Sequence, residues 1–169
     1  MGRIKKAHHT GLQVESLDRS LAFYRDILGF EQAFRWNPQA PYIGVLVGYP
    51  DVDLHAAILR MPDSDTFLEL LEYRNVDRHP VDTSTANPGT AHVAFFVDDL
   101  DGLYEELKAK GVADVSPPVT PTIGPNAGGR AVYMIDPDGI RVELIESSGS
   151  FGDYKGPPDQ QPAVSGGCC

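Results

Sequence analysis

Apolar residues along the chain follow two periods, one typical of strands and one typical of helices. Residues 9–14 read His-Thr-Gly-Leu-Gln-Val, and this alternation predicts a β-strand with one buried face. Between residues 17 and 28, leucines and a tyrosine recur three or four positions apart, which predicts an amphipathic helix. Ser16 is placed to cap this helix and Gly29 to end it. The opening segment therefore predicts a strand followed by a helix.

The same strand-and-helix pattern returns near the middle of the chain. His92-Val-Ala-Phe-Phe-Val97 keeps the first histidine and the last valine of the opening strand at the same spacing. Leucines and a tyrosine between residues 100 and 107 predict a second amphipathic helix, which Asp98 or Asp99 can cap and Gly111 can end. A strand that begins with histidine and leads into a helix is therefore expected twice.

A second landmark repeats near the end of each half. Phe67-Leu-Glu-Leu-Leu-Glu72 is echoed by Arg141-Val-Glu-Leu-Ile-Glu146, and both segments alternate as half-buried strands do. Asp136-Pro-Asp-Gly139 precedes the later copy and predicts a hairpin turn. Strands are expected over 30–36, 42–49, 54–61 and 66–73 in the first half, and over 112–116, 130–135 and 140–146 in the second.

These patterns divide the chain into two units of similar design. The first unit is expected over residues 1–73, followed by a polar linker over 74–88. The second is expected over 89–146, with a mobile loop rich in proline and glycine at 117–129. Residues 147–169, rich in Gly, Pro, Ser and Gln, are expected to form a disordered tail.

Composition and charge narrow the classes of function. With 41% apolar and 22% charged residues, the 169-residue chain has the composition of a globular protein. A formal net charge of −10 disfavours nucleic acid and anionic membranes as partners, which favours a small-molecule substrate. The chain has neither the ~18 consecutive apolar residues of a membrane-spanning helix nor a signal-peptide core, so we expect a cytoplasmic protein. Cys168 and Cys169 are adjacent at the C-terminus, so they cannot form a disulfide bond that links distant parts of the fold.

Alternation along the strands assigns each side chain to one face of its sheet. In the first strand, the apolar residues suit the face under the helix, which places His9 on the opposite face. The same parity places Glu69 opposite its neighbouring leucines. His92 and Glu143 hold the corresponding positions in the second unit. Each unit is thus expected to project one imidazole and one carboxylate from the face away from its helix.

A shared metal site explains why these four residues repeat. A carboxylate on a half-buried strand is costly to desolvate unless it is paired or bound to a metal. If the two units pair about an approximate twofold axis, the four side chains form a site for one divalent metal ion. The ligands would be His9, Glu69, His92 and Glu143. Mixed imidazole and carboxylate ligation suits Zn²⁺, Ni²⁺, Co²⁺, Mn²⁺ or Fe²⁺ and does not select among them.

Several further motifs accompany these residues: Phe23-Tyr24 and Leu28-Gly29-Phe30, Leu68-Glu69-Leu70, Val97-Asp98-Asp99-Leu100, and Asp136-Pro-Asp-Gly139 leading to Val142-Glu143-Leu144. With them, residues from about 7 to 146 resemble the vicinal oxygen chelate superfamily. That superfamily contains glyoxalase I, methylmalonyl-CoA epimerase, fosfomycin-resistance proteins, extradiol dioxygenases and bleomycin-resistance proteins. The resemblance implies an α+β fold of paired βαβββ modules, which form a curved mixed sheet around a metal cleft.

The resemblance also implies a type of chemistry. The four ligand positions match those of glyoxalase-like and epimerase-like members, in which the metal chelates substrate through neighbouring oxygens. The metal would favour formation of an enediolate, and either Glu143 or Glu69 would act as the general base, since the repeat makes the two near-equivalent. The same resemblance is the basis for expecting a homodimer.

Other residues are candidates for the substrate pocket. The candidates on or near the expected metal-binding face are Gln13, Phe96 and Tyr133, together with Tyr73 and Trp36. For the aromatic residues, burial in the hydrophobic core is an equally good interpretation. Arg130 is a candidate for binding a substrate carboxylate or phosphate, with a salt bridge at the strand edge as the alternative. His8 is expected to face away from His9, and His55 is expected at the surface or in the core.

Two other functions fit parts of the pattern. An Fe(II) extradiol-type dioxygenase would use only His9, His92 and Glu143 as ligands, so a carboxylate at Glu69 favours the isomerase and lyase branch. A metal-free drug-binding protein similar to bleomycin-resistance proteins would not need two histidines and two glutamates directed into one cleft. A metal-dependent lyase or isomerase is therefore the leading hypothesis.

Overall fold

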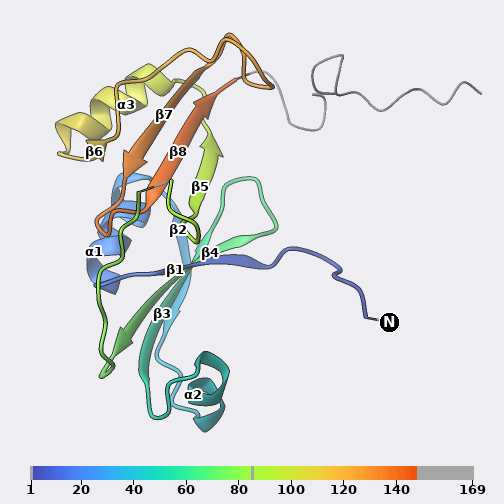
Figure 1. The fold of residues 1–169 in the computed structure, drawn as a ribbon, viewed down its shortest axis with the longest axis vertical. Helices are drawn as coiled ribbons and strands as arrows, with labels where there is room; N and C mark the ends of the chain where they lie inside the picture. The colour runs from blue at the N-terminus through green and yellow to red at the C-terminus, as the bar shows by residue number, and fades with distance from the viewer. Residues whose placement is uncertain (1, 85, 148–169) are drawn as a thin grey trace, which may run out of the picture. The chain divides into compact units, whose positions relative to one another are not determined.

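The computed structural model describes residues 2–84 and 86–147. The described residues form two compact units, the first within 2–87 together with 136–140 and the second within 88–135 together with 141–147. Each unit contains a four-stranded mixed sheet (Figure 1). The predicted tail over 147–169 and the two cysteines fall outside the described residues, apart from Ser147.

The first unit follows the order predicted from its repeat, with one additional helix. Its sheet has the strand order β1-β4-β3-β2, in which β1 is parallel to β4 and the other pairs are antiparallel. Its elements are β1 (His9–Gln13), α1 (Leu17–Leu21), η1 (Ala22–Ile27), β2 (Glu31–Trp36), α2 (Pro41–Val47), β3 (Asp53–Arg60) and β4 (Phe67–Arg74).

The second unit repeats this topology. Its sheet has the order β5-β8-β7-β6, again with a parallel pair, β5 and β8, and antiparallel pairs beyond it. Its elements are β5 (His92–Phe96), α3 (Leu100–Ala109), β6 (Ala113–Asp114), β7 (Arg130–Ile135) and β8 (Arg141–Glu146). Both units are therefore βαβββ modules, and the predicted α+β fold is confirmed.

Each sheet buries the face that its helix covers. In β4, Leu68 and Leu70 are fully buried, while Glu69 between them is only partly covered. In β8, Val142 and Leu144 are buried in the same way. The helices supply matching residues to these cores: Leu17, Leu21, Tyr24, Leu100 and Leu107. Burial of these side chains supplies the main driving force for each unit, because the hydrophobic effect scales with the apolar area removed from water.

The last glutamate of each repeated landmark caps the helix of its own unit. Glu72 Oε2 accepts a hydrogen bond from the backbone N–H of Leu17 at 2.9 Å, and Glu146 Oε2 accepts one from Leu100 at 2.7 Å. Glu72 is only 8% exposed and also receives a hydrogen bond from Arg74. A carboxylate at a helix N-terminus satisfies an otherwise unpaired N–H and complements the helix dipole. The repetition of this glutamate therefore has a structural cause that the sequence pattern alone did not reveal.

The local capping predictions are confirmed. Ser16 Oγ accepts a hydrogen bond from the backbone N–H of Arg19, and Asp99, the second of the two predicted candidates, accepts one from Gly102. Gly29 and Gly111 both have a positive φ after their helices, at 78° and 80°. Glycine adopts this conformation without the steric penalty of a Cβ atom, which ends each helix where the sequence predicted.

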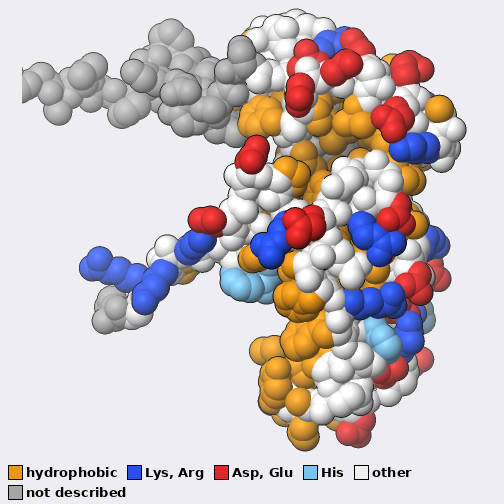
Figure 2. Space-filling model, turned by 180° about the vertical axis from the view of Figure 1, so that it is seen from behind, with side chains coloured by type: hydrophobic (Ala, Val, Ile, Leu, Met, Phe, Trp, Pro, Cys, Tyr) orange, Lys and Arg blue, Asp and Glu red, His pale blue; other side chains and the backbone are white. Residues whose placement is uncertain are grey.

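The strand predicted over 42–49 is wrong, because this segment forms helix α2. Pro41 stands in its first turn, and Gly48 ends it with a φ of 77°. A short, continuous apolar run does not distinguish a strand from a helix by its periodicity. Side chains on the outer side of α2, among them Tyr42, Val45 and Leu46, are exposed, and apolar side chains gather at this surface of the first unit (Figure 2).

Two other elements differ in detail from the prediction. The first helix changes from α-helical to π-helical hydrogen bonding in η1, where the N–H of Leu28 donates to the carbonyl of Phe23 at 3.0 Å. The strand predicted over 112–116 is reduced to the two residues of β6. Pro117 and Pro118 follow it and have no N–H to donate, which interrupts the ladder, and pairing with β7 resumes in one isolated bridge between Val119 and Ala131.

The turn Asp136-Pro-Asp-Gly139 joins β7 to β8, as predicted. Asp136 Oδ1 accepts hydrogen bonds from the backbone N–H groups of Asp138 and Ile140, at 2.9 and 2.7 Å. Its other oxygen accepts a hydrogen bond from the Tyr24 hydroxyl at 2.9 Å. Burial raises the pKa of Asp136 above its ordinary value. Residues 136–140 therefore belong to the first compact unit, although the strands that they connect lie in the second.

A search of the described residues finds no helix with the length and apolar character needed to cross a membrane.

We predict that Glu72→Gln destabilises the protein and reduces its sensitivity to acid. The hydrogen bond from Arg74 is the main cause that keeps the pKa of Glu72 below its ordinary value of 4.5, and the N–H of Leu17 adds to it. A carboxylate with a lowered folded-state pKa stabilises the fold above its unfolded-state pKa, and this contribution is lost as the pH falls through the folded-state pKa. The substitution should cost about 1–2 kcal/mol at neutral pH.

Urea unfolding measured from neutral to acidic pH tests this prediction. The variant should lose less additional stability than the wild type as the pH falls below 4.5. Glu31→Gln is the matched control, because the Glu31 side chain is 72% exposed and pairs only with Arg60 among the described residues. Equal stability of Glu72→Gln and wild type at neutral pH would contradict the capping role.

Candidate functional site

The first unit brings His9 and Glu69 together at its sheet. The Nε2 atom of His9 lies 3.1 Å from Oε2 of Glu69, and the two side chains are 39% and 14% exposed. Parallel pairing of β1 with β4 places Glu69 opposite Gly11, two residues beyond the histidine. A Cβ atom on Gly11 would lie 3.8 Å from Oε2 of Glu69. This is an ordinary van der Waals distance, so a small residue at this position is compatible with the contact between the carboxylate and His9.

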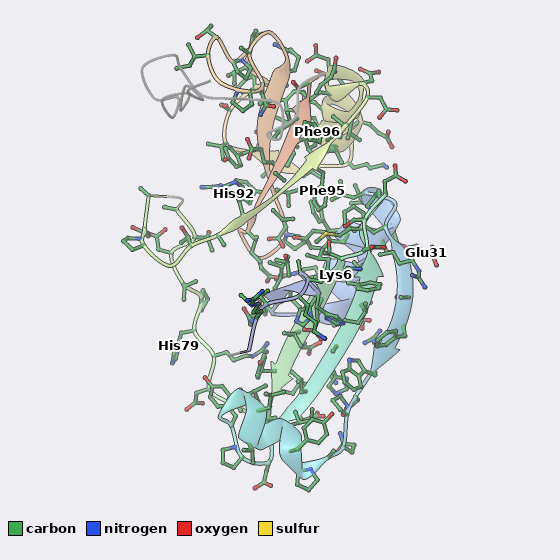
Figure 3. All side chains as sticks on the ribbon, turned by 90° about the vertical axis from the view of Figure 1, so that its right-hand side faces the viewer. Lys6, Glu31, His79, His92, Phe95 and Phe96 are labelled. Carbon is green, nitrogen blue, oxygen red and sulfur yellow. The ribbon has the colours of Figure 1, made fainter. Side chains whose placement is uncertain are left out.

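The second unit builds the same pair from His92 and Glu143. The Nε2 atom of His92 lies 3.2 Å from Oε2 of Glu143, and the side chains are 44% and 20% exposed. Parallel pairing of β5 with β8 places Glu143 opposite Ala94, again two residues beyond the histidine. Figure 3 labels His92 and Phe96 at the two ends of β5. Each unit thus presents one imidazole and one carboxylate on one face of its sheet, and the buried aliphatic side chains of the same strand lie on the opposite face.

The donor types in each pair suit a divalent metal. Imidazole nitrogen and carboxylate oxygen are ligands for Zn²⁺ and for first-row transition metals. Within the part of the chain that the structure describes, no group of three or more His, Cys, Asp or Glu side chains is placed to hold a metal ion. The structure therefore shows two matched half-sites, and their union into one four-ligand site stays a prediction.

His8 contacts His9 and orients it. The Nδ1 atoms of the two imidazoles lie 2.6 Å apart, and their rings meet edge to face with centroids separated by 5.0 Å. The prediction that His8 faces away from His9 is wrong, because His8 precedes β1 and strand alternation does not apply to it. Because Nδ1 of His9 contacts His8, its Nε2 atom is the nitrogen that faces Glu69.

Apolar residues surround Glu69 on the open face of the first sheet. Residues that pair across neighbouring strands form rows on this face. In the row that contains Glu69, Ile58 of β3 lies beside the carboxylate and Phe34 of β2 lies beyond Ile58. The next row contains Gln13 and ends at Trp36, which packs edge to face on Phe34. Gln13 is exposed at the edge of the sheet, and Phe34 and Trp36 are about half exposed. The open face of this unit is therefore largely apolar beside one ion pair.

The open face of the second sheet carries Tyr133 beside its ion pair. Tyr133 lies opposite Glu143 in the pairing of β7 with β8, and its ring packs edge to face on His92 with centroids 5.4 Å apart. Burial, the charge of Glu143 and a hydrogen bond to that carboxylate raise the pKa of Tyr133. Phe96, in the next row of the sheet, is 56% exposed. Tyr133 thus contacts both members of the pair, while Phe96 lies further from it.

A comparison with protein families identifies the fold. Residues 6–144 match the model described as the Glyoxalase/Bleomycin resistance protein/Dioxygenase superfamily. The chain belongs to this superfamily. The predicted resemblance is therefore confirmed over most of the chain.

Relatives within the superfamily include two kinds of enzyme. The chain is 35% identical over 143 residues to a 2-epi-5-epi-valiolone epimerase from an Actinomyces species, covering 82% of this chain and 77% of the relative. It is 34% identical over 142 residues to the lactoylglutathione lyase of Haemophilus influenzae, covering 82% and 90%. These activities are those of the two relatives.

Solved structures share the fold. A glyoxalase family protein from Bacillus cereus aligns with a TM-score of 0.74 at 22% identity, over 86% of this chain and 96% of that one. Glyoxalase I of Leishmania major aligns with a TM-score of 0.62 at 23% identity, over 85% and 87%. At these identities the likeness shows the superfamily fold alone.

Arg130 is not on the face that carries the candidate ligands in this superfamily member. Its guanidinium forms a salt bridge with Asp101 of α3 at 2.6 Å and also contacts Thr120. Along β7, Arg130 has the opposite parity to Tyr133, which places it on the helix side of the sheet. The prediction that Arg130 lies in the substrate pocket is therefore wrong, and the alternative prediction of a salt bridge at the strand edge holds.

Arg141 also lies on the open face of the second sheet. It pairs in register with His92, two residues before Glu143, and sequence reasoning did not single it out. Its Nε atom is buried and has no hydrogen-bond partner among the described residues. Arg141 and Glu143 are two residues apart on β8, so strand alternation places both on the same face. The sequence therefore already indicated the position of Arg141.

His55 takes part in a separate polar cluster. Its Nε2 atom lies 3.1 Å from Asp53 and 2.8 Å from the Asn37 side-chain amide. This histidine is one-fifth exposed, so it lies near the surface as expected. The hydrogen bond from Asn37 is the main cause that lowers the pKa of Asp53, with a smaller contribution from His55. The cluster ties β3 to the segment after β2.

We predict that Arg130→Gln leaves metal binding unchanged and lowers the free energy of unfolding by at most about 1 kcal/mol. The salt bridge with Asp101 joins side chains that are 33% and 64% exposed, and such pairs contribute little because solvent screens them. Metal affinity measured against a chromogenic chelator, together with urea unfolding, provides the test. A loss of metal affinity of tenfold or more would return Arg130 to the site.

Proposed function

We propose that this protein is a metal-dependent lyase or isomerase of the glyoxalase or epimerase type. Its substrate would be a small molecule that binds the metal through two adjacent oxygen functions. The observation that supports this proposal most strongly is the matched pair of His–Glu contacts, 3.1 Å in one unit and 3.2 Å in the other. Neither pair is needed to hold its sheet together, because the ladders and the buried cores already do so.

The residues that would hold the metal are His9, Glu69, His92 and Glu143. When bound, a divalent metal supplies Lewis-acid polarisation of the substrate oxygens and so makes a neighbouring C–H bond more acidic. The identity of the metal is open among Zn²⁺, Ni²⁺, Co²⁺, Mn²⁺ and Fe²⁺. A homodimer, expected from the resemblance, is part of the proposal.

A carboxylate of the site would move the proton. One glutamate removes a proton from the carbon next to the substrate carbonyl. The proton then returns to the carbonyl carbon while the hydroxyl proton moves to the former carbonyl oxygen, or the other glutamate supplies a proton to the opposite face of the same carbon. The first outcome is isomerisation and the second is epimerisation, and both balance without another reactant. The partly covered position of Glu69 limits access of water, which assists proton transfer between carboxylate and carbon.

The relatives support this branch of the superfamily. An epimerase and a lactoylglutathione lyase at 35% and 34% identity both cover 82% of this chain. The carboxylate at Glu69 supports it as well, because a dioxygenase with a facial triad needs only His9, His92 and Glu143. The Fe(II) dioxygenase is the second candidate, and the metal-free drug-binding protein is the third.

We predict that the purified protein contains about one divalent metal ion per chain and depends on it for activity. The four proposed ligands would form one site, so a higher content would indicate additional binding. Elemental analysis gives the stoichiometry, and isomerase activity is measured after EDTA treatment and after addition of Zn²⁺, Ni²⁺, Co²⁺ or Mn²⁺. Protein that is fully folded without metal and gains no isomerase activity when metal is added would support the metal-free drug-binding function instead.

We predict that Glu69→Gln lowers turnover by roughly 10²-fold or more, because the amide cannot accept the proton that a general base removes. The isomerase or lyase should also turn over without consuming oxygen, which an oxygen electrode measures. A dioxygenase would show oxygen uptake and would tolerate Glu69→Gln. Glu31→Gln, at an exposed carboxylate of the same unit, serves as the control for a general effect of lost charge.

A further inference from the structure

One arginine of the second sheet has no polar partner among the described residues. Arg141 is the first residue of β8, and its Nε atom is buried without a hydrogen-bond partner. Its guanidinium joins no ion pair within residues 2–84 and 86–147. The residue as a whole is only partly exposed, so its charge is partly removed from water without a counter-ion from these residues. A buried donor of this kind requires an explanation, because native proteins leave few of them unpaired.

The other arginines of the two units are paired with acceptors of the protein. The chain has 24 acidic against 14 basic residues, so the unpaired state of Arg141 does not result from a shortage of carboxylates. Every arginine from Arg19 to Arg130 has a carboxylate or a carbonyl as partner. The pairs are Arg19 with Asp138, Arg25 with Asp26, Arg35 with Asp18, Arg60 with Glu31, Arg74 with Glu72, Arg78 with the carbonyls of Val14 and Glu15, and Arg130 with Asp101.

Arg141 lies beside the His92–Glu143 pair. It is in register with His92 across β5 and β8, and Glu143 follows two residues later on the same strand. Side chains two residues apart on a strand share a face, so the guanidinium and the carboxylate are neighbours on the open face. The Glu143 carboxylate nevertheless contacts Nε2 of His92, at 3.2 Å, and forms no ion pair with Arg141. The candidate half-site therefore has an adjacent cation that its own carboxylate does not neutralise.

The fold does not require a cation at this position. In the first unit, Phe67 pairs with His9 as Arg141 pairs with His92. The guanidinium of Arg60 lies 5.9 Å from the centroid of the Phe67 ring, but Arg60 is already paired with Glu31. A module of the same topology thus forms with an apolar ring where the second module has a charged side chain. This difference favours a ligand-binding role for Arg141 over a structural one.

We propose that Arg141 binds an anionic group of the substrate, a carboxylate or a phosphate, next to the oxygens that chelate the metal. This inference rests on the proposed function and names its substrate class: a small molecule with two adjacent oxygen functions and a separate anionic group. A guanidinium presents its N–H donors in a planar fork that matches the oxygens of a carboxylate or a phosphate. Such a ligand would supply the counter-charge that the described residues do not.

The first experiment compares three hydroxamates on Co²⁺-loaded wild-type protein. Each chelates a metal through two adjacent oxygens, and they differ only in the group at the end of a two-carbon spacer. Butanohydroxamate ends in a methyl group, succinic monohydroxamate in a carboxylate and 3-phosphonopropanohydroxamate in a phosphonate. The dissociation constants are measured by titration of the Co²⁺ d–d absorption. We expect at least one anionic probe to bind about tenfold or more tightly than the neutral probe, because a charge-assisted hydrogen bond is added.

The identity of the preferred probe distinguishes a carboxylate substrate from a phosphorylated one. This arm needs no variant, so it does not depend on the folding of any substituted protein. Equal dissociation constants for the three probes would overturn the inference.

A second experiment assigns the preference to Arg141. Arg141→Gln should bind butanohydroxamate within a few-fold of wild type and lose the preference for the anionic probe. Arg141→Lys should retain part of it, because lysine keeps the charge but not the planar fork. Arg130→Gln is the matched control: Arg130 belongs to the same unit but pairs with Asp101 on the helix side of the sheet, so this variant should keep the full preference.

The outcomes separate this inference from the proposed function. A wild-type preference for the anionic probe that persists in Arg141→Gln would overturn the role of Arg141. Wild-type protein that binds no Co²⁺ would overturn the proposed function, and the inference with it. Protein that binds Co²⁺ and all three hydroxamates with equal affinity would overturn the inference alone.

Discussion

Parallel pairing of the first and last strands of each module is the constraint on which the candidate site depends. Because β1 runs beside β4 in a fixed register, His9 and Glu69 lie one row apart on the same face. The pairing of β5 with β8 repeats this relation for His92 and Glu143. A shift of one residue would turn these side chains towards the helix and expose the buried rows, so core packing and site geometry are fixed by the same register.

The closing strand of each module carries two carboxylates with different roles. Glu69 and Glu72 are an odd number of residues apart, so they project from opposite faces of β4. The first belongs to the open face with His9, and the second caps α1 through Leu17. The helix is thereby anchored to the strand that presents the candidate metal ligand, which links stability of the module to the position of its ligand.

The differences between the modules are as informative as their likeness. Tyr133 stands where Ile58 stands in the other module, and Arg141 stands where Phe67 does. Both changes put polar groups around the second half-site, while the first retains apolar surroundings. The repeat supplies one His–Glu pair in each module, and the residues opposite the two glutamates differ.

The sequence by itself determined the repeat, the strand and helix periods, the caps at Ser16 and Asp99, and the face on which each candidate ligand lies, because these follow from local spacing. Only the tertiary structure decided that α2 is a helix, that Arg130 pairs with Asp101, and that Tyr133 lies opposite Glu143. These facts depend on which distant segments meet. A period along one strand states which face a side chain takes, but the neighbour across the ladder is set by register and by the packing of the whole module.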